Sequence, residues 1–236
     1  MTESTKVAII TGASQGIGAG LVAGFRSLGY SVVANSRSIG ASREPRIISV
    51  AGDIADPAIA EKVVASAIEH FGRVDTLVNN AGVFVAKPFE SYSAGDFKSV
   101  LHTNLAGFFN VSQLAVRQML KQGSGHIVNV TTSLVEVADS NVPSVLASLT
   151  KGGLASAIKS LAIEYASRGI RANAVSPGIV QTPMHDPATY EGLAGLHPLK
   201  RMGTIDDVVR GVLYLEQSPF VTGEFLHVDG GQSAGR

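Results

Sequence analysis

The chain has 236 residues, 45% of them hydrophobic and 16% charged, and its formal net charge is +0 at pH 7. A neutral chain of this length fits one sizeable core and excludes the strongly basic surface typical of nucleic-acid binding or of docking to an anionic membrane. The sequence contains no cysteine, which excludes disulfides, thiol nucleophiles and cysteine-based metal sites.

The first residues, MTESTK (1–6), are polar and lack the basic-then-apolar pattern of a signal peptide. No apolar run approaches the roughly 20 residues needed to span a bilayer. We therefore expect a cytoplasmic protein with a small-molecule substrate, and neither a nucleic acid nor a membrane as partner.

Short β-branched runs recur along the whole chain and predict seven strands. Most runs are continuously apolar, which is typical of strands buried on both faces of a parallel sheet. The predicted strands, in chain order, are VAII (7–10), SVVAN (31–35), RIISV (46–50), TLVNN (76–80), HIVNV (126–130), ANAVS (172–176) and EFLHV (224–228).

Amphipathic helical patterns such as 56–72 and 206–217 separate these strands. This alternation predicts an α/β fold, a Rossmann-like doubly wound parallel sheet with helices on both faces. Only the Gly/Pro-punctuated stretch 36–45 separates the second and third strands, so the helix there is expected to be stunted or absent. Nothing divides the sequence, and we expect a single domain over 1–236 with a substrate lid at about 179–198.

The first strand runs directly into the glycine-rich loop TGASQGIG (11–18) and then into a helical pattern. In this context glycines permit a tight turn and close backbone approach to a pyrophosphate, which the helix N-terminus holds. The sequence predicts a dinucleotide site here, formed by Gly12, Ser14, Gln15, Gly16, Ile17 and Gly18.

The end of the second strand reads the adenosine ribose in such folds. The stretch ANSRS (34–38) has no acidic residue and carries Arg37, whose guanidinium can bind a 2′-phosphate. We expect NADP(H) as the preferred cofactor and NAD(H) as the alternative. Asp53 and Ile54, after the third strand, are expected to contact the adenine.

Taken in order, these motifs resemble those of the classical short-chain dehydrogenase/reductase family over essentially the whole chain. The glycine loop matches the cofactor loop of that family, and 79–82 (NNAG) matches its motif after the fourth strand. Ser176-Pro177-Gly178 with Thr182 matches its PG loop, and 222–231 matches its closing strand. The resemblance implies that Asn80, Ala81, Gly82, Pro177, Gly178 and Thr182 contact the cofactor.

The resemblance also implies a catalytic set of Asn, Ser, Tyr and Lys. Asn104 and Lys151 match two of these positions, and Lys151 would also bind the cofactor ribose. The serine position falls on Thr132, with Ser133 adjacent. The tyrosine position, four residues before Lys151, is Ala147. No shift of register restores a tyrosine, because the tyrosines of the chain are Tyr30, Tyr92, Tyr165, Tyr190 and Tyr214.

The missing tyrosine leaves three interpretations open. In the first, the chain is an NADPH-dependent reductase of a small carbonyl or imine, and water or Lys151 supplies the proton. An iminium carbon needs only a hydride, so an imine would make the tyrosine dispensable. In the second, the chain is a non-catalytic NADP-binding sensor or assembly protein. In the third, it oxidises a hydroxylated substrate.

Further groups are candidates for contact with the substrate. The lid segment carries Met184 and also His185, Tyr190 and His197, which are further candidates for the proton donor. The loop before Ala147 carries Glu136 and Asp139, which would stabilise a cationic substrate.

Two helical stretches, 110–120 and 152–166, carry small and apolar residues at helical spacing. The resemblance implies a homotetramer formed through these helices, with a dimer as the alternative. No His, Asp and Glu cluster has metal-ligand spacing, and we expect no metal.

Overall fold

The computed structural model describes residues 5–235 and contains one seven-stranded sheet in which every neighbouring pair of strands is parallel. The strand order is β3-β2-β1-β4-β5-β6-β7. The strands are β1 (Val7–Thr11), β2 (Ser31–Ser36), β3 (Ile47–Ala51), β4 (Thr76–Asn79), β5 (Gly125–Val130), β6 (Ile170–Pro177) and β7 (Phe225–Val228).

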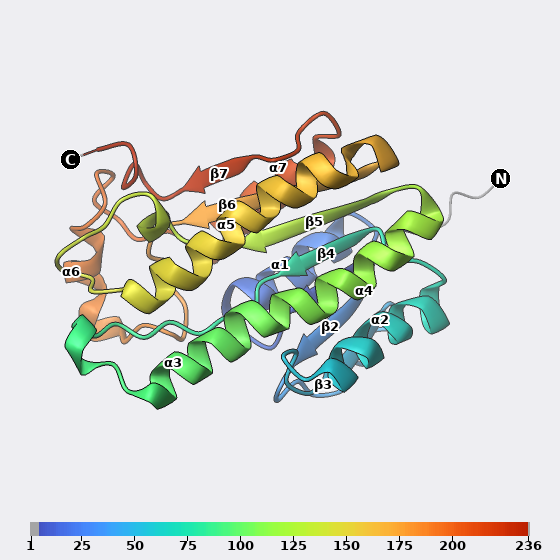
Figure 1. Cartoon of the computed structure of the whole chain (residues 1–236), viewed down its shortest axis with the longest axis horizontal. Helices are drawn as coiled ribbons and strands as arrows, with labels where there is room; N and C mark the ends of the chain where they lie inside the picture. Colours follow the sequence, from blue (N-terminus) through green and yellow to red (C-terminus); the bar gives the residue numbers. More distant parts are fainter. Residues whose placement is uncertain (1–4, 236) are drawn as a thin grey trace.

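One face of the sheet is covered by α2 (Pro57–Phe71), α4 (Gly107–Gln122) and α5 (Val145–Tyr165), which lie in front of the strands in Figure 1. Their apolar faces bury residues such as Val63, Met119 and Ile158 against the strands. Asp56 caps α2 by accepting a hydrogen bond from the Ala58 N–H, and a left-handed Gly72 ends it. The local sequence therefore fixes both ends of this helix.

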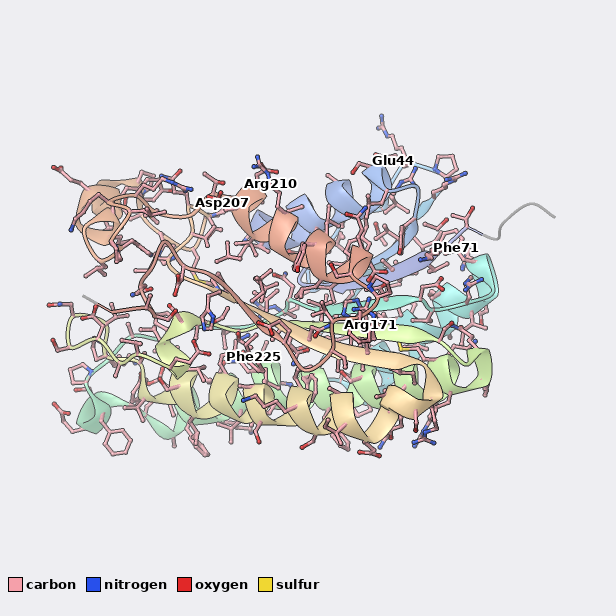
Figure 2. All side chains as sticks on the ribbon, turned by 90° about the horizontal axis from the view of Figure 1, so that it is seen from above. Glu44, Phe71, Arg171, Asp207, Arg210 and Phe225 are labelled. Carbon is pink, nitrogen blue, oxygen red and sulfur yellow. The ribbon has the colours of Figure 1, made fainter. Side chains whose placement is uncertain are left out.

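The opposite face is covered by α1 (Gly16–Ser27) and α7 (Ile205–Gln217), which bury Leu21, Phe25 and Val212. Thr204 and Asp207 form a capping box at the start of α7. Figure 2 shows the sheet between these two helical layers, with Phe225 on the side of α5 and Arg210 on the outer side of α7. The predicted doubly wound sheet with helices on both faces is confirmed.

The connection between β2 and β3 contains no helix, as the short stretch 36–45 predicted. Elsewhere the right-handed crossovers require a helix between parallel strands. The two strands pair directly, with Ser36 opposite Ala51.

The carboxyl ends of the strands point to the left in Figure 1, and the irregular segments gather there. These segments are η1 (Phe89–Ser91), α3 (Ala94–Leu101), the π-helical turn η2 (His102–Ala106), η3 (Ser133–Val135), η5 (Pro187–Thr189) and α6 (Tyr190–Ala194). A short turn η4 (Ala166–Arg168) lies instead at the far end of α5. Ligands bind at the carboxyl edge in open α/β sheets, so the fold itself indicates where a site belongs.

Candidate active site

A cavity of about 680 Å³ opens at this carboxyl edge and extends from the glycine loop to the lid segment. Every predicted cofactor residue lines this cavity. These residues are Gly12, Ser14, Gln15, Gly16, Ile17, Gly18, Arg37, Asp53, Ile54, Asn80, Ala81, Gly82, Lys151, Pro177, Gly178 and Thr182. The fold therefore brings residues from seven separate stretches of the sequence to one continuous surface.

The glycine loop is glycine for steric reasons. A Cβ on Gly18 would lie 2.1 Å from the Gly12 carbonyl oxygen, and one on Gly12 would lie 2.9 Å from the Ala81 Cα. Gly12 also has φ +65°, which favours glycine. At the start of α1 the Gln15 side chain does not cap the helix, so the N–H groups of the first turn remain available to an anion.

Asn80 fastens this loop to the end of β4. Its Nδ2 donates to the carbonyl oxygens of Thr11 and Gly12, at 3.0 and 3.2 Å. The N–H groups of Asn80 and Ala81 both donate to the Thr11 hydroxyl. These four hydrogen bonds from the NNAG stretch to Thr11 and Gly12 hold the backbone of the glycine loop in place.

Polar groups converge where the cavity meets the end of β2. The hydroxyl of Ser36, the last residue of β2, donates to the Ser14 hydroxyl at 2.8 Å. Arg37 is exposed beside them, and its guanidinium has no hydrogen bond or ion pair with residues 5–235. An unpaired guanidinium next to two hydroxyls is suited to a phosphate.

Asp53 and Ile54 line the neighbouring wall. The Asp53 carboxylate accepts a hydrogen bond from the Ala55 N–H at 3.0 Å and lies 3.8 Å from the His102 ring nitrogen Nε2. Ile54 is buried. The backbone hydrogen bond holds Asp53 in the turn after β3, and the apolar Ile54 surface lies beside it.

Lys151 extends from α5 to the centre of the cavity. Its Nζ donates to the Val130 carbonyl at 2.8 Å, while part of the side chain faces the cavity. Burial lowers the pKa of this ammonium group to about 8, because desolvation disfavours the charged form. Lys151 is therefore poised to exchange a proton near neutral pH.

Asn104 is buried in the π-helical turn η2, directly behind the cavity wall rather than on its lining. Its Oδ1 accepts from the Val83 N–H at 2.9 Å, and its Nδ2 donates to the Val83 carbonyl and the Thr150 hydroxyl. A Cβ on Gly82 would lie 3.2 Å from the Lys151 Nζ and 3.3 Å from the Asn104 Oδ1. The Lys151 Nζ and the Asn104 Oδ1 therefore both lie next to Gly82, where a side chain would crowd them.

Ala147 lies on α5 one turn before Lys151, is 3% exposed and lines the same cavity. Thr150 next to Lys151 is buried and donates to the carbonyls of Leu146 and Ala147.

Thr132 and Ser133, the two residues at the predicted serine position, make different contacts. Thr132 caps η3 through its hydroxyl and lines the cavity, whereas the buried Ser133 donates its hydroxyl to Gln232 at 2.8 Å.

The PG loop is held by a histidine. The ring of buried His197 accepts from the Ile179 N–H at Nε2 and contacts the Leu193 carbonyl through Nδ1. A Cβ on Gly178 would lie 2.7 Å from the Nε2 of His197. His197 therefore packs under the loop and does not line the cavity.

The substrate candidates divide into two groups. Met184 and His185 line the cavity beside Ala147, and burial lowers the pKa of His185. Tyr190 and Glu136 lie off the lining. Glu136 accepts a hydrogen bond from the His227 ring, which turns its carboxylate toward β7, and Tyr190 begins the outer helix α6. Asp139 is buried and accepts from the N–H and side chain of Asn141.

The lining residues that sequence reasoning missed include the polar residues Ser36, Thr103, Asn141 and Gln232. Ser36 had a signal, since it follows the apolar run of β2 directly. Thr103 lies in the π-helical turn η2, Asn141 in a loop and Gln232 near the chain end, and no periodic pattern marks a site at any of the three.

Among residues 5–235, no helix combines the length and apolar character that crossing a membrane requires. The same residues contain no group of three or more His, Asp or Glu side chains that could hold a metal ion.

Comparison with known proteins places this architecture and site in one class. Residues 12–233 match the family model described as Enoyl-(Acyl carrier protein) reductase. The chain therefore belongs to this family, within the classical short-chain dehydrogenases/reductases, which are oxidoreductases.

Individual relatives span nearly the same length. Glucose 1-dehydrogenase from Gluconobacter oxydans (strain 621H) is 32% identical, over 96% of this chain and 91% of the relative. The 3-oxoacyl-[acyl-carrier-protein] reductase FabG of Staphylococcus aureus (strain Mu50 / ATCC 700699) is also 32% identical, over 97% of this chain and 98% of the relative.

Solved structures agree with these sequence matches. ElxO with NADP bound superposes with a TM-score of 0.91 at 29% identity, covering 98% of this chain and 100% of the other. The 3-ketoacyl-(acyl-carrier-protein) reductase from Brucella melitensis, complexed with NADH, gives a TM-score of 0.90 at 31% identity, covering 97% and 98%.

Proposed function

We propose that this protein is an NADPH-dependent oxidoreductase that reduces a small carbonyl or imine substrate by a mechanism without tyrosine. The observation that carries the proposal is the pairing of Lys151 and Ala147 in one cavity. The lysine retains a buried ammonium group with a pKa of about 8, while the position of the usual proton donor has only a methyl side chain.

The residues present fit the cofactor. The first turn of α1 has no side-chain cap, the glycine loop brings backbone close to the cavity, and Arg37 is unpaired among residues 5–235. The glycine loop and first turn of α1 would hold the pyrophosphate, Ser14, Ser36 and Arg37 the 2′-phosphate, and Lys151 the nicotinamide ribose. When bound, NADPH supplies hydride to the substrate. Cofactor-bound relatives support NADP(H) with NAD(H) as the alternative.

In this proposal the proton reaches the substrate from Lys151 or a water, without an intervening tyrosine. Lys151 is partly deprotonated near neutral pH, so its ammonium form can donate a proton and recover it readily. The Thr132 hydroxyl lines the cavity and can hold the substrate carbonyl, or a water that relays the proton. Asn104, fixed to Val83 and Thr150, keeps the wall beside Lys151 in place.

An imine substrate would not need the missing proton donor, because an iminium nitrogen is already cationic and its carbon requires only hydride. The carboxylate of Glu136 is engaged by His227 and lies off the cavity lining, so it does not contribute to binding that charge. The imine hypothesis therefore rests on Ala147 alone.

The proposal is tested by following NADPH oxidation with a panel of ketones and cyclic imines. Turnover of ketones alone would exclude the imine hypothesis. Turnover of imines alone would mean that no tyrosine is needed, because an iminium substrate requires only hydride. Tight NADPH binding with no turnover of any substrate, in either direction, would contradict the enzyme proposal.

Ala147 also favours a second candidate, a non-catalytic NADP-binding sensor or assembly protein. The cofactor residues are complete while the proton donor of the family is missing. Lys151 and Asn104 would then serve cofactor and backbone only. The turnover panel separates the two candidates directly.

We further propose that 179–198 acts as a lid and that the chain assembles as a homotetramer. His197 clamps the lid segment at Ile179 and Leu193, leaving the residues between them to move. On α4 and α5, Phe109 is 60% and Ile163 is 83% exposed, which suits apolar contact with a second copy. Molar mass measured by light scattering tests the assembly.

A further inference from the structure

Gln232 lies near the chain end, in the turn after β7, and contributes to the cavity wall at the end that carries Ala147. Its side chain reaches back to the loop after β5, where its Oε1 accepts the Ser133 hydroxyl at 2.8 Å. The next residue, Leu134, accepts at its carbonyl from the hydroxyl of Ser148, the neighbour of Ala147, so this loop joins the Gln232 side of the cavity to the Ala147 side. Both residues are buried, with Ser133 1% and Gln232 7% exposed. Residues 99 positions apart in the sequence thus form one buried polar pair.

The backbone that presents Gln232 is rigid. The Asp229 carboxylate accepts from the N–H groups of Gly231 and Ser233, at 2.9 and 2.8 Å, and the Gln232 N–H donates to the Asp229 carbonyl. Gly230 and Gly231 have φ +62° and +90°, values that allow the chain to turn here. The turn therefore fixes the direction from which the amide enters the cavity.

The hydrogen bond from Ser133 also fixes which end of the amide is free. Its oxygen is occupied, so the NH₂ group remains, and this Nε2 has no hydrogen-bond partner among residues 5–235. The cavity that Gln232 lines also has apolar lining residues, which include Leu134, Val142 and Leu193. A donor held in a fixed direction in a partly apolar cavity favours a ligand that carries an acceptor over one that lacks it.

We propose that Gln232 is a specificity-determining residue, whose Nε2 donates a hydrogen bond to an acceptor oxygen of the substrate other than the reacting group. This inference rests on the proposed function, because it places the substrate in the part of the cavity beside Ala147. It defines a substrate class: molecules with a carbonyl, carboxylate or hydroxyl oxygen in addition to the reacting centre. Ser133 is the positioning residue that orients the amide.

The test compares ethyl acetoacetate with methyl pentyl ketone, which has the same chain length but lacks the ester oxygens. Dissociation constants for the protein–NADP⁺ complex are measured by calorimetry, which requires no turnover, and NADPH oxidation is followed separately. The variants are Gln232→Met, which keeps the length of the side chain but has no donor, Gln232→Glu, which keeps the acceptor for Ser133, and Ser133→Ala. Gln217→Met, on an exposed glutamine at the end of α7, is the matched control.

We expect the wild type and Gln217→Met to bind the ketoester about tenfold more tightly than the ketone, the value of one good hydrogen bond. In Gln232→Met and Gln232→Glu the ratio falls to about one, and in Ser133→Ala it lies between, because the amide then rotates freely. A wild-type ratio near one, binding of neither probe, or a ratio that Gln232→Met leaves intact would overturn the proposal.

Failure of the proposed function has a different signature. Loss of the binding ratio in Gln232→Met with no NADPH oxidation by the wild type supports the Gln232 site and contradicts the reductase. NADPH oxidation by the wild type, with a binding ratio that Gln232→Met leaves unchanged, supports the reductase and contradicts the Gln232 site. Thermal unfolding of each variant verifies that it is folded.

Discussion

The Nζ of Lys151 donates a hydrogen bond to the backbone carbonyl of Val130 at 2.8 Å. This bond joins α5 to the last residue of β5 and holds the ammonium group at the centre of the cavity. It is the only hydrogen bond that Lys151 makes with residues 5–235, so two of its N–H groups remain for ligands. The lysine is therefore fixed in position before any ligand arrives.

Replacing Ala147 by tyrosine should restore the proton donor that the family uses. We expect Ala147→Tyr to raise kcat for ketone reduction by at least about tenfold, since a positioned general acid contributes roughly 10²–10⁴. Ala147→Phe fills the same space without a hydroxyl and is the control. An equal gain in both variants would mean that the added ring, and not its hydroxyl, is responsible. A loss in both would show that the vacant space is part of the mechanism.

The pH dependence of reduction should follow Lys151. The ammonium form is the proton donor and its pKa is about 8, so kcat/KM should be constant below that pH and fall as pH rises through it. Initial rates of NADPH oxidation over about pH 6 to 10 measure this profile. In Lys151→Arg the guanidinium stays charged and the inflection should disappear. An unchanged inflection in that variant would assign the titration to another group.

Arg37 should govern the choice between the two cofactors. In Arg37→Ala the dissociation constant for NADPH should rise by about 10- to 100-fold, because a charge-assisted hydrogen bond contributes about 1.5–3 kcal/mol, whereas that for NADH should change little. Fluorescence titration measures both constants. Arg43→Ala removes an exposed arginine of the same connection that does not line the cavity. Equal weakening of both cofactors in Arg37→Ala would contradict a 2′-phosphate contact.

Glu216 should stabilise the fold at the opposite end of the sheet. Its carboxylate accepts from Tyr30, Thr76 and His126, at 2.7, 2.9 and 2.7 Å, and its side chain is 7% exposed. We expect Glu216→Ala to lower the free energy of unfolding by about 3 kcal/mol or more, because three buried donors lose their acceptor. Urea denaturation measures the loss, with the exposed Glu61→Ala as control.

The acid stability of the protein should depend on the same carboxylate. Burial acts to raise its pKa, but the hydrogen bonds from His126, Tyr30 and Thr76 outweigh burial and lower the pKa to about 2. The stabilisation is therefore complete above the ordinary pKa of about 4.5 and is lost as pH falls from there toward 2. Burial lowers the pKa of His126, whose Nε2 lies 2.9 Å from the Asn173 Nδ2. Glu216→Ala should lack this part of the pH dependence.

Most of the fold could be predicted because its signals are local. Strands buried on both faces read as continuous apolar runs, such as VAII in β1, and glycines must occupy positions where a Cβ would collide with backbone. The short connection 36–45 likewise has too few residues for a crossover helix. These features depend on chain length and side-chain size, which the sequence states directly.

The finer arrangement of the site depends on contacts between distant parts of the chain. The pairing of Ser133 with Gln232, the attachment of Glu136 to His227 and the support of Ile179 by His197 each join separate loops. A sequence pattern shows which side chains are available but not which way a loop turns them. For that reason Glu136 and Tyr190 were expected at the cavity and lie off its lining.

The π-helical turn η2 makes the position of Asn104 depend on the number of residues as well as on their identity. The turn, His102–Ala106, interrupts an otherwise continuous helical path from α3 into α4. A π-turn holds one residue more than an α-helical turn, and each residue advances an α-helix by about 100°. Removing Leu105 would relax the turn to α-helix and carry Asn104 away from Val83 and Thr150, although every side chain named at the site remained encoded.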